Sequence, residues 1–112
     1  MSGSAVRAFF EALPSRFDAA AAEGVTAVYQ FDLSGGEGGQ YQLHIANQTC
    51  RVSSGIHPAP NVTLRMAGED CVAILDGRLS GVSAYLNGRL RVDGDIGLAM
   101  RLAAFFPDLR PK

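Results

Sequence analysis

The segment with the clearest potential for chemistry is residues 88–102, GRLRVDGDIGLAMRL, in which a short strand leads through a glycine turn into a helix. This layout binds phosphate when several glycine amides and a lysine converge on the start of the helix, as in GxxxxGKS/T. Here only Gly94 and Gly97 flank the turn, and Asp95 places an anion where a phosphate would bind. The Asp95 carboxylate is suited to accept hydrogen bonds from the first helical amides. The segment therefore predicts a capped helix rather than a nucleotide site.

The remaining polar residues form no set that is typical of catalysis or metal binding. No serine lies in a GxSxG pattern. His44 falls on the polar side of its strand and His57 in a proline-containing loop, without a partner at metal-ligand spacing, so both are interpreted as ordinary exposed histidines. The carboxylates fall at helix starts, in turns or on polar strand faces, and no pair is placed for acid–base work. The sequence predicts no catalytic residue, no metal and no cofactor, and hence a protein that is not an enzyme.

Length and composition limit the class of protein further. The 112 residues fit one domain, residues 1–112. A net charge of −1 with scattered basic residues does not favour nucleic acid. No stretch approaches the ~20 apolar residues of a membrane span, so stable membrane insertion is not expected. The ends show neither a secretory signal layout nor a peroxisomal address. Cys50 and Cys71 are interpreted as reduced small residues of a cytoplasmic protein, although a disulfide between them stays open.

The N-terminal part has the periodicity of a helix. Apolar residues recur at three- and four-residue spacing from Val6 to Ala20, with Ser2 or Ser4 as the expected cap. Pro14 interrupts this pattern, so it is expected to end one helix at Leu13 or to begin the next turn. Asp18 is expected to cap the alanine-rich turn that follows.

The middle of the chain and one later segment alternate between apolar and polar residues, which predicts strands. Short links join the first three strands and suggest a meander, with GGEGG as the first turn, whereas the longer loop before the fourth contains prolines. One wet face and one covered face are expected, and the fold class is α+β with a mainly antiparallel sheet. The five predicted strands are residues 25–33, 40–45, 49–53, 61–66 and 89–92.

The C-terminal part is predicted to be helical over residues 69–77, 80–88 and 96–106. The last of these helices is almost wholly apolar, so it needs a second apolar neighbour besides the sheet. In one interpretation it is buried between the sheet and the first helix, or it forms a dimer contact. In the other, one of its faces lines a cavity for an apolar ligand, with Leu79, Val82 and Leu86 on the opposite wall. Periodicity leaves both open.

Residues 27–45 and 61–102 resemble the sterol carrier protein 2 family of lipid-transfer domains. The likeness covers nearly the whole chain and is most specific in QFDLSGGEGGQY and in DGRLSGVSAYLNGRLRVDGDIGLAMRL. It implies helices on one face of a five-stranded sheet and a hydrophobic tunnel between sheet and helices. Ser80-Gly81 stands where the family often has Asn-Pro, which implies a looser or differently angled entrance helix. Without a peroxisomal tail the chain is more similar to bacterial members.

The resemblance implies non-catalytic binding or transfer of a fatty acid, fatty acyl-CoA or similar apolar ligand, with fatty acyl chains favoured over sterols. The alternative is a protein-interaction or accessory module, a homodimer or a lipid-presenting partner of a biosynthetic enzyme, that uses the apolar last helix. Carried over by position, the lipid-lining residues implied are Leu75, Leu79, Val82, Leu86, Leu98, Leu102, Phe105 and Phe106, to which Phe10 and Phe31 are added.

Overall fold

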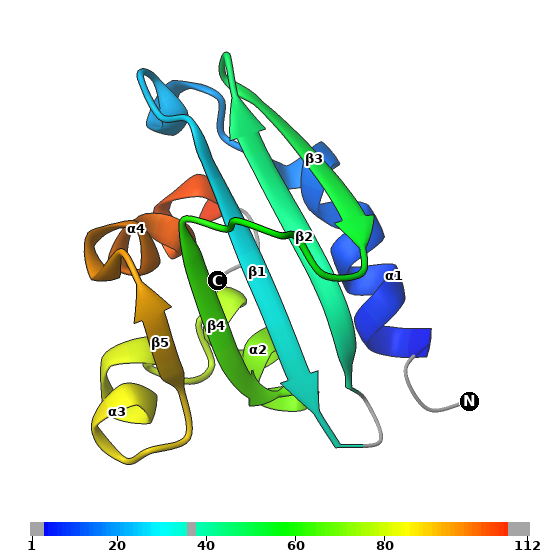
Figure 1. Ribbon diagram of the computed structural model, residues 1–112, viewed down its shortest axis with the longest axis vertical. Coiled ribbons are helices and arrows are strands. Elements are labelled where there is room, and N and C mark those ends of the chain that lie inside the picture. The colour runs from blue at the N-terminus through cyan, green and yellow to red at the C-terminus, as the bar shows by residue number, and fades with distance from the viewer. Residues whose placement is uncertain (1–3, 36–37, 108–112) are drawn as a thin grey trace.

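Five strands form one sheet in the order β3-β2-β1-β4-β5 (Figure 1). In the computed structural model, which describes residues 4–35 and 38–107, each predicted strand is present with ends shifted by three residues or fewer. Their bounds are β1 Ala27–Ser34, β2 Gly39–Ala46, β3 Thr49–Ser54, β4 Val62–Ala67 and β5 Arg91–Gly94.

The sheet is mixed, with three antiparallel pairings and one parallel pairing. β1, β2 and β3 form the predicted meander, and β4 pairs with β5 in the antiparallel sense. β4 runs parallel to β1, because the connection from β3 crosses in front of β2 and β1 before β4 begins (Figure 1). The expectation of a mainly antiparallel sheet is confirmed, and the parallel central pair is the feature that the alternation did not predict.

Short helices cover one face and one edge of the sheet. In Figure 1, α1 and α2 lie behind the sheet, whereas α3 and α4 lie beside its β5 edge. The predicted turn GGEGG and the predicted cap Ser2 include residues outside the described ranges. The helical elements are α1 Ser4–Ala12, η1 Leu13–Arg16, η2 Ala20–Ala22, α2 Gly68–Leu75, α3 Gly81–Leu86, α4 Ile96–Arg101 and η3 Leu102–Phe105, where η marks a 3-10 helix.

Side-chain caps fix where several of these helices begin. The Asp95 carboxylate accepts a hydrogen bond from the Leu98 amide at 3.1 Å, so the predicted cap is confirmed. The Asp18 carboxylate accepts from the Ala20 amide at 3.1 Å, as expected. Pro14 lies in the first turn of η1, where its missing N–H costs nothing.

The last helix departs from its prediction. Instead of one helix over residues 96–106, α4 ends at Arg101 and a 3-10 turn, η3, follows. Side chains three residues apart eclipse one another in a 3-10 turn. Leu102 and Phe105 therefore both point into the core, where they are at most 6% exposed. In the described part of the chain, no helix combines the length and apolar character needed to span a membrane.

Candidate functional site

A cavity of about 520 Å³ lies between the β4–β5 side of the sheet and the helices α2, α3 and α4. This volume falls within the ~300–1,000 Å³ that is typical of small-molecule pockets. Four of its lining residues, Val82 and Tyr85 on α3 and Ile96 and Met100 on α4, are also strongly exposed. The cavity therefore opens to solvent between these two helices.

The sheet contributes the inner wall of the cavity through one row of side chains. Phe31 pairs with Leu64 across β1 and β4, and Leu64 pairs with Val92 across β4 and β5. Paired residues on neighbouring strands point to the same face. Met66 and Leu90, each two residues from a member of this row, extend the same wall.

The helical walls follow from three- and four-residue spacing. On α2, Cys71, Ile74 and Leu75 face the cavity. The C-terminal wall comes from α4 and η3, whose lining residues are Ile96, Ala99, Met100, Leu102 and Ala103. Ser80 is the cap of α3, and its hydroxyl accepts from the Ser83 amide at 3.2 Å. Ser80-Gly81, which departs from the family pattern, therefore begins the helix that borders the opening.

No lining side chain carries a charge at neutral pH. The titratable groups in the wall are the Cys71 thiol and the Tyr85 hydroxyl. Burial raises the pKa of the Cys71 thiol above its ordinary value, which keeps this group neutral. An apolar cavity without an ionic anchor binds a ligand mainly by removing apolar surface from water.

Half of the residues proposed from the sequence lie together in the cavity wall. These are Phe31, Leu75, Leu79, Val82 and Leu102, and they come from β1, α2, the α2–α3 connection, α3 and η3. The structure therefore brings together residues that are as much as 71 positions apart in the sequence. Their contact with a lipid remains a prediction.

The other five proposed residues lie outside the cavity wall. Leu86 projects to solvent with 75% of its surface exposed. Leu98 packs at the margin of the core, and its backbone carbonyl accepts a hydrogen bond from the Tyr29 hydroxyl at 2.7 Å. Phe10, Phe105 and Phe106 are fully buried in the core.

Sequence reasoning missed most of the sheet wall and part of the last helix. Leu64, Met66, Leu90 and Val92 were recognised as the apolar side of their strands but not as lining residues. The strand alternation that placed them on the covered face was the signal available. Met100 was missed because the resemblance pointed to its neighbours on the helix.

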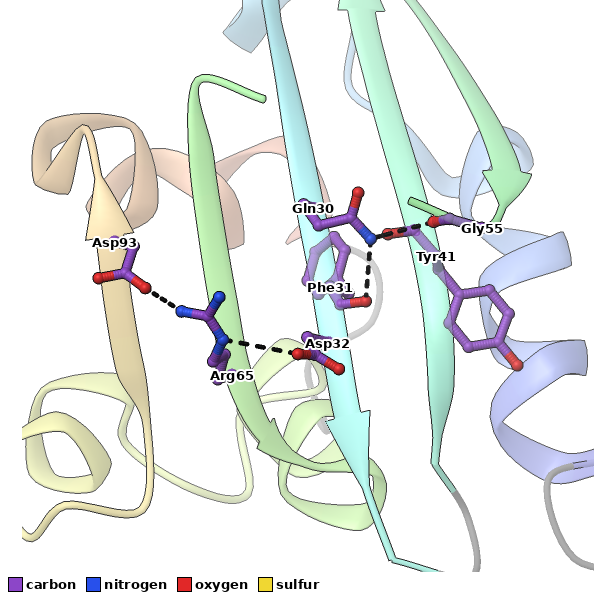
Figure 2. A network of polar contacts seen from close by, with 7 residues as sticks. All are labelled: Gln30, Phe31, Asp32, Tyr41, Gly55, Arg65 and Asp93. Carbon is purple, nitrogen blue, oxygen red and sulfur yellow. Dashed lines mark hydrogen bonds and ion pairs between the residues drawn. The ribbon is translucent and has the colours of Figure 1, made fainter. Parts of the chain in front are cut away.

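The opposite face of the sheet carries polar contacts that cover part of the β1–β2 surface (Figure 2). The Gln30 amide donates to the Gly55 carbonyl at 3.0 Å, and its oxygen accepts from the His57 amide at 2.7 Å. Gln30 is only 4% exposed, so the face predicted to be exposed to solvent is covered at this point by the crossing loop, residues 55–61, which joins β3 to β4. Arg65 forms ion pairs with Asp32 and Asp93 on the same face (Figure 2).

The interpretation of the two histidines as ordinary exposed residues is wrong. His44 and His57 are half-buried, and their ring centroids lie 5.5 Å apart because the crossing loop brings His57 over β2. Burial, followed by the charges of Arg51 and His57, lowers the pKa of His44. Across the described ranges, no group of three or more His, Cys, Asp or Glu side chains is placed to hold a metal ion.

Comparison with known proteins shows the family to which this fold and cavity belong. A sequence model of the SCP-2 sterol transfer family matches residues 9–107. Hydroxysteroid dehydrogenase-like protein 2 of Rattus norvegicus is 38% identical over 78 residues, which are 68% of this chain and 15% of that protein. Stomatin-like protein 1 of Homo sapiens is 37% identical over 89 residues, 77% of this chain and 22% of that protein. The chain thus spans less than a quarter of either relative.

Two solved structures of a mosquito protein share the fold over most of their length. The crystal structure of sterol carrier protein 2-like 2 from Aedes aegypti superposes with a TM-score of 0.70 and 25% identity, covering 89% of this chain and 92% of that one. The solution structure of the palmitated form of that mosquito protein gives a TM-score of 0.68 and 27% identity, and covers 93% of each chain.

Proposed function

This chain belongs to the SCP-2 sterol transfer family, a family of lipid-binding and lipid-transfer domains, and we propose that its cavity holds one fatty acyl chain or a similar single-chain lipid. The observation that carries the proposal is the uncharged wall of the cavity between β4, β5 and the helices α2 to α4. The similarity to a mosquito protein solved in a palmitated form supports an acyl ligand over a sterol.

The size of the cavity fits such a ligand. If each methylene takes roughly the ~30 Å³ that a water molecule occupies in the liquid, then about 520 Å³ accommodates a chain of about seventeen carbons. Burial of about twelve methylenes contributes on the order of 10 kcal/mol before the costs of association. A micromolar dissociation constant needs only ~8 kcal/mol. Methylene contacts discriminate weakly, so we propose broad selectivity among chains of similar length.

A pair of neighbouring alanines provides the test of this site. Ala103 lines the cavity, whereas Ala104 is exposed and lies outside its wall. Ala103→Phe fills part of the cavity, so it is expected to weaken binding of a fluorescent fatty acid at least tenfold, while the matched Ala104→Phe leaves the affinity unchanged. Equal affinities for Ala103→Phe and wild type would contradict binding in this cavity. Native mass spectrometry with organic extraction would identify any lipid that the purified protein carries.

We also propose that this chain acts by binding and transfer, without a reaction of its own. The family relatives with dehydrogenase-like names are much longer proteins, of which this chain matches 15–25%. Hydrolysis of an acyl-CoA or ester by the purified chain, lost on substitution of a single polar residue, would overturn this proposal. The alternative of a homodimer through the last helix is tested by sedimentation of the same preparation, because a monomer that binds lipid needs no second copy to complete its site.

A further inference from the structure

The face of the sheet opposite to the helices carries a group of hydrogen-bond donors over β2 and β3, which we call the donor cluster. The register places His44 directly opposite Arg51 and Gln42 directly opposite Ser53, so these four side chains share one face. The crossing loop completes the cluster, because it brings the centroid of the His57 ring to 5.5 Å from that of His44. We propose that the donor cluster binds a small soluble phosphate monoester.

Hydrogen bonds around the two rings fix which of their nitrogens carry protons. Gln42 donates through its amide nitrogen to the Ser54 carbonyl at 3.3 Å, so its amide oxygen is left to face His44. His44 Nε2 lies 3.0 Å from that oxygen and therefore donates to it. His57 Nδ1 accepts from the Ala59 amide at 3.0 Å, so His57 carries its proton on Nε2. The Nε2–H of His57 is then a donor that a ligand can use.

Arg51 and Ser53 add further donors beside the rings. Arg51 is exposed and forms no ion pair with the part of the chain that the structure describes. The Ser53 hydroxyl oxygen lies 3.5 Å from His44 Nε2, which leaves the hydroxyl proton available to a ligand. On the same face, Arg65 already pairs with two carboxylates (Figure 2). Arg51 therefore supplies positive charge that the described residues do not neutralise.

The empty donor cluster is electrostatically unfavourable. Arg51 lies directly opposite His44, and like charges in opposite positions of a sheet destabilise it. Burial, and after it the charges of Arg51 and His57, lower the pKa of His44. On its other side His44 pairs with the uncharged Val28 of β1, which does not offset this repulsion. A bound anion would offset it and favour protonation of His44.

A phosphate monoester matches this set of donors better than a carboxylate. Its terminal group has three strong acceptor oxygens and a charge of about −1.5 to −2 at pH 7. The fork of the Arg51 guanidinium suits two of these oxygens. The His57 Nε2–H and the Ser53 hydroxyl are donors for the third. A carboxylate has only two oxygens and would leave part of the cluster unpaired.

The donor cluster is separate from the lipid cavity, so this proposal does not rest on the proposed function. The cavity is lined from β1, β4, β5 and the helices, and it opens between α3 and α4 beside the β5 edge. In the sheet order, β1 and β4 lie between β5 and β2 (Figure 1). Three strand spacings, ~14 Å, and the sheet itself therefore separate the cluster from the opening. We accordingly expect a soluble ligand rather than the headgroup of a lipid held in the cavity.

The chain contains only two histidines, so their ring signals in NMR spectra report directly on the donor cluster. Titration with glycerol phosphate at pH 7 and constant ionic strength should shift both ring signals until they saturate. Bound glycerol phosphate should also raise the pKa of His44. Sodium chloride at the same ionic strength should shift neither signal. Equal shifts with chloride, or no shift with glycerol phosphate, would overturn the proposal.

Arg51→Gln tests the cluster itself, and Arg65→Gln is the matched control at an exposed arginine on the same face. Loss of charge-assisted hydrogen bonds should weaken glycerol phosphate binding at least tenfold in Arg51→Gln, whereas Arg65→Gln should keep wild-type affinity. Both variants should bind fluorescent fatty acid as wild type does, which separates this site from the cavity. Equal phosphate affinities of Arg51→Gln and wild type would refute the site. Displacement of glycerol phosphate by vesicles that contain phosphatidic acid would overturn the soluble ligand in favour of a lipid headgroup.

Discussion

The helix-covered face of the sheet has two sides, one over β1 to β3 and one over β4 and β5, and the helices pack on them differently. Over β1, β2 and β3, side chains of α1 and η1 pack directly on the strands: the Phe10 ring stacks on Tyr41 at 4.4 Å and meets Phe31 edge-on at 5.0 Å. Over β4 and β5, the helices α2, α3 and α4 stand off from the sheet and leave a cavity. In Figure 1 these sides lie to the right and to the left of β1.

The same alternation of apolar and polar residues in the strands therefore serves two purposes in one sheet. The α1 side, defined as α1 and η1 over β1 to β3, stabilises the fold through close packing. The cavity side, defined as α2 to α4 over β4 and β5, leaves apolar surface unfilled, which native interiors avoid unless something binds there. Aromatic residues concentrate on the α1 side, whereas Leu, Ile, Val and Met line most of the cavity.

The largest expected effect is a loss of stability when a side chain of each side is truncated to alanine. Phe10→Ala removes a fully buried ring and should lower the free energy of unfolding by about 3–5 kcal/mol. Leu79→Ala, at a half-buried residue that already borders empty space, should cost less than about 2 kcal/mol. Urea denaturation of both variants measures this contrast. Equal losses would mean that the cavity side is packed as closely in solution as the α1 side.

Tyr29 joins the two sides, because its ring lies on β1 and its hydroxyl donates to the Leu98 carbonyl of α4 at 2.7 Å. Burial raises the pKa of Tyr29 to about 12. The folded state therefore holds the proton more tightly than the unfolded state, and stability that is complete below pH 10 is lost as the pH rises toward 12. The loss from this group should reach about 2 kcal/mol.

Tyr29→Phe isolates that contribution. The variant should be less stable than wild type at neutral pH by about 1 kcal/mol, because the Leu98 carbonyl loses its hydroxyl donor. It should also lose less stability between pH 10 and 12, while the buried cysteine thiols contribute equally to both proteins. Denaturation at several pH values, with Tyr85→Phe as the control at an exposed ring, measures the difference. Parallel pH profiles for Tyr29→Phe and wild type would contradict burial of this hydroxyl between the sheet and α4.

The features that were predictable from the sequence are those set by local chemistry. Alternation identified every strand, and the caps Asp18 and Asp95 marked helix starts because a side-chain oxygen follows the same rule in any fold. Leu86 shows the limit of this reasoning. α3 has only six residues, and periodicity over so short a helix does not decide which face turns inward. Ala84, the buried residue of α3, faces inward instead of Leu86.

Features that depend on contacts between distant parts of the chain had no signal in the local sequence. The crossing loop makes β4 parallel to β1 and covers Gln30, and neither outcome follows from the composition of the loop. The 3-10 turn after Arg101 turned Phe105 into the core and away from the cavity. Half of the proposed lining residues lie in the cavity wall, because the positions carried over from the family resemblance include β1, α2, the α2–α3 connection, α3 and η3, which border the cavity.

The smallest expected effect concerns the face of β1 to β3 that lies opposite to α1, where the crossing loop brings His57 over His44. The folded state lowers the pKa of His44, chiefly by burial, so it disfavours the charged ring. Stability present above pH 6.5 is therefore lost as the pH falls below that value, because the unfolded state takes up the proton first. Solvent screens a half-buried ring, so the loss should be about 0.5 kcal/mol or less. His44→Gln should remove it, as urea denaturation at pH 7 and pH 5 would measure. The Gln30 contacts hold the crossing loop in both proteins. Identical acid profiles for His44→Gln and wild type would therefore mean that the loop leaves His44 open to water. The loop would then cover Gln30 but not His44.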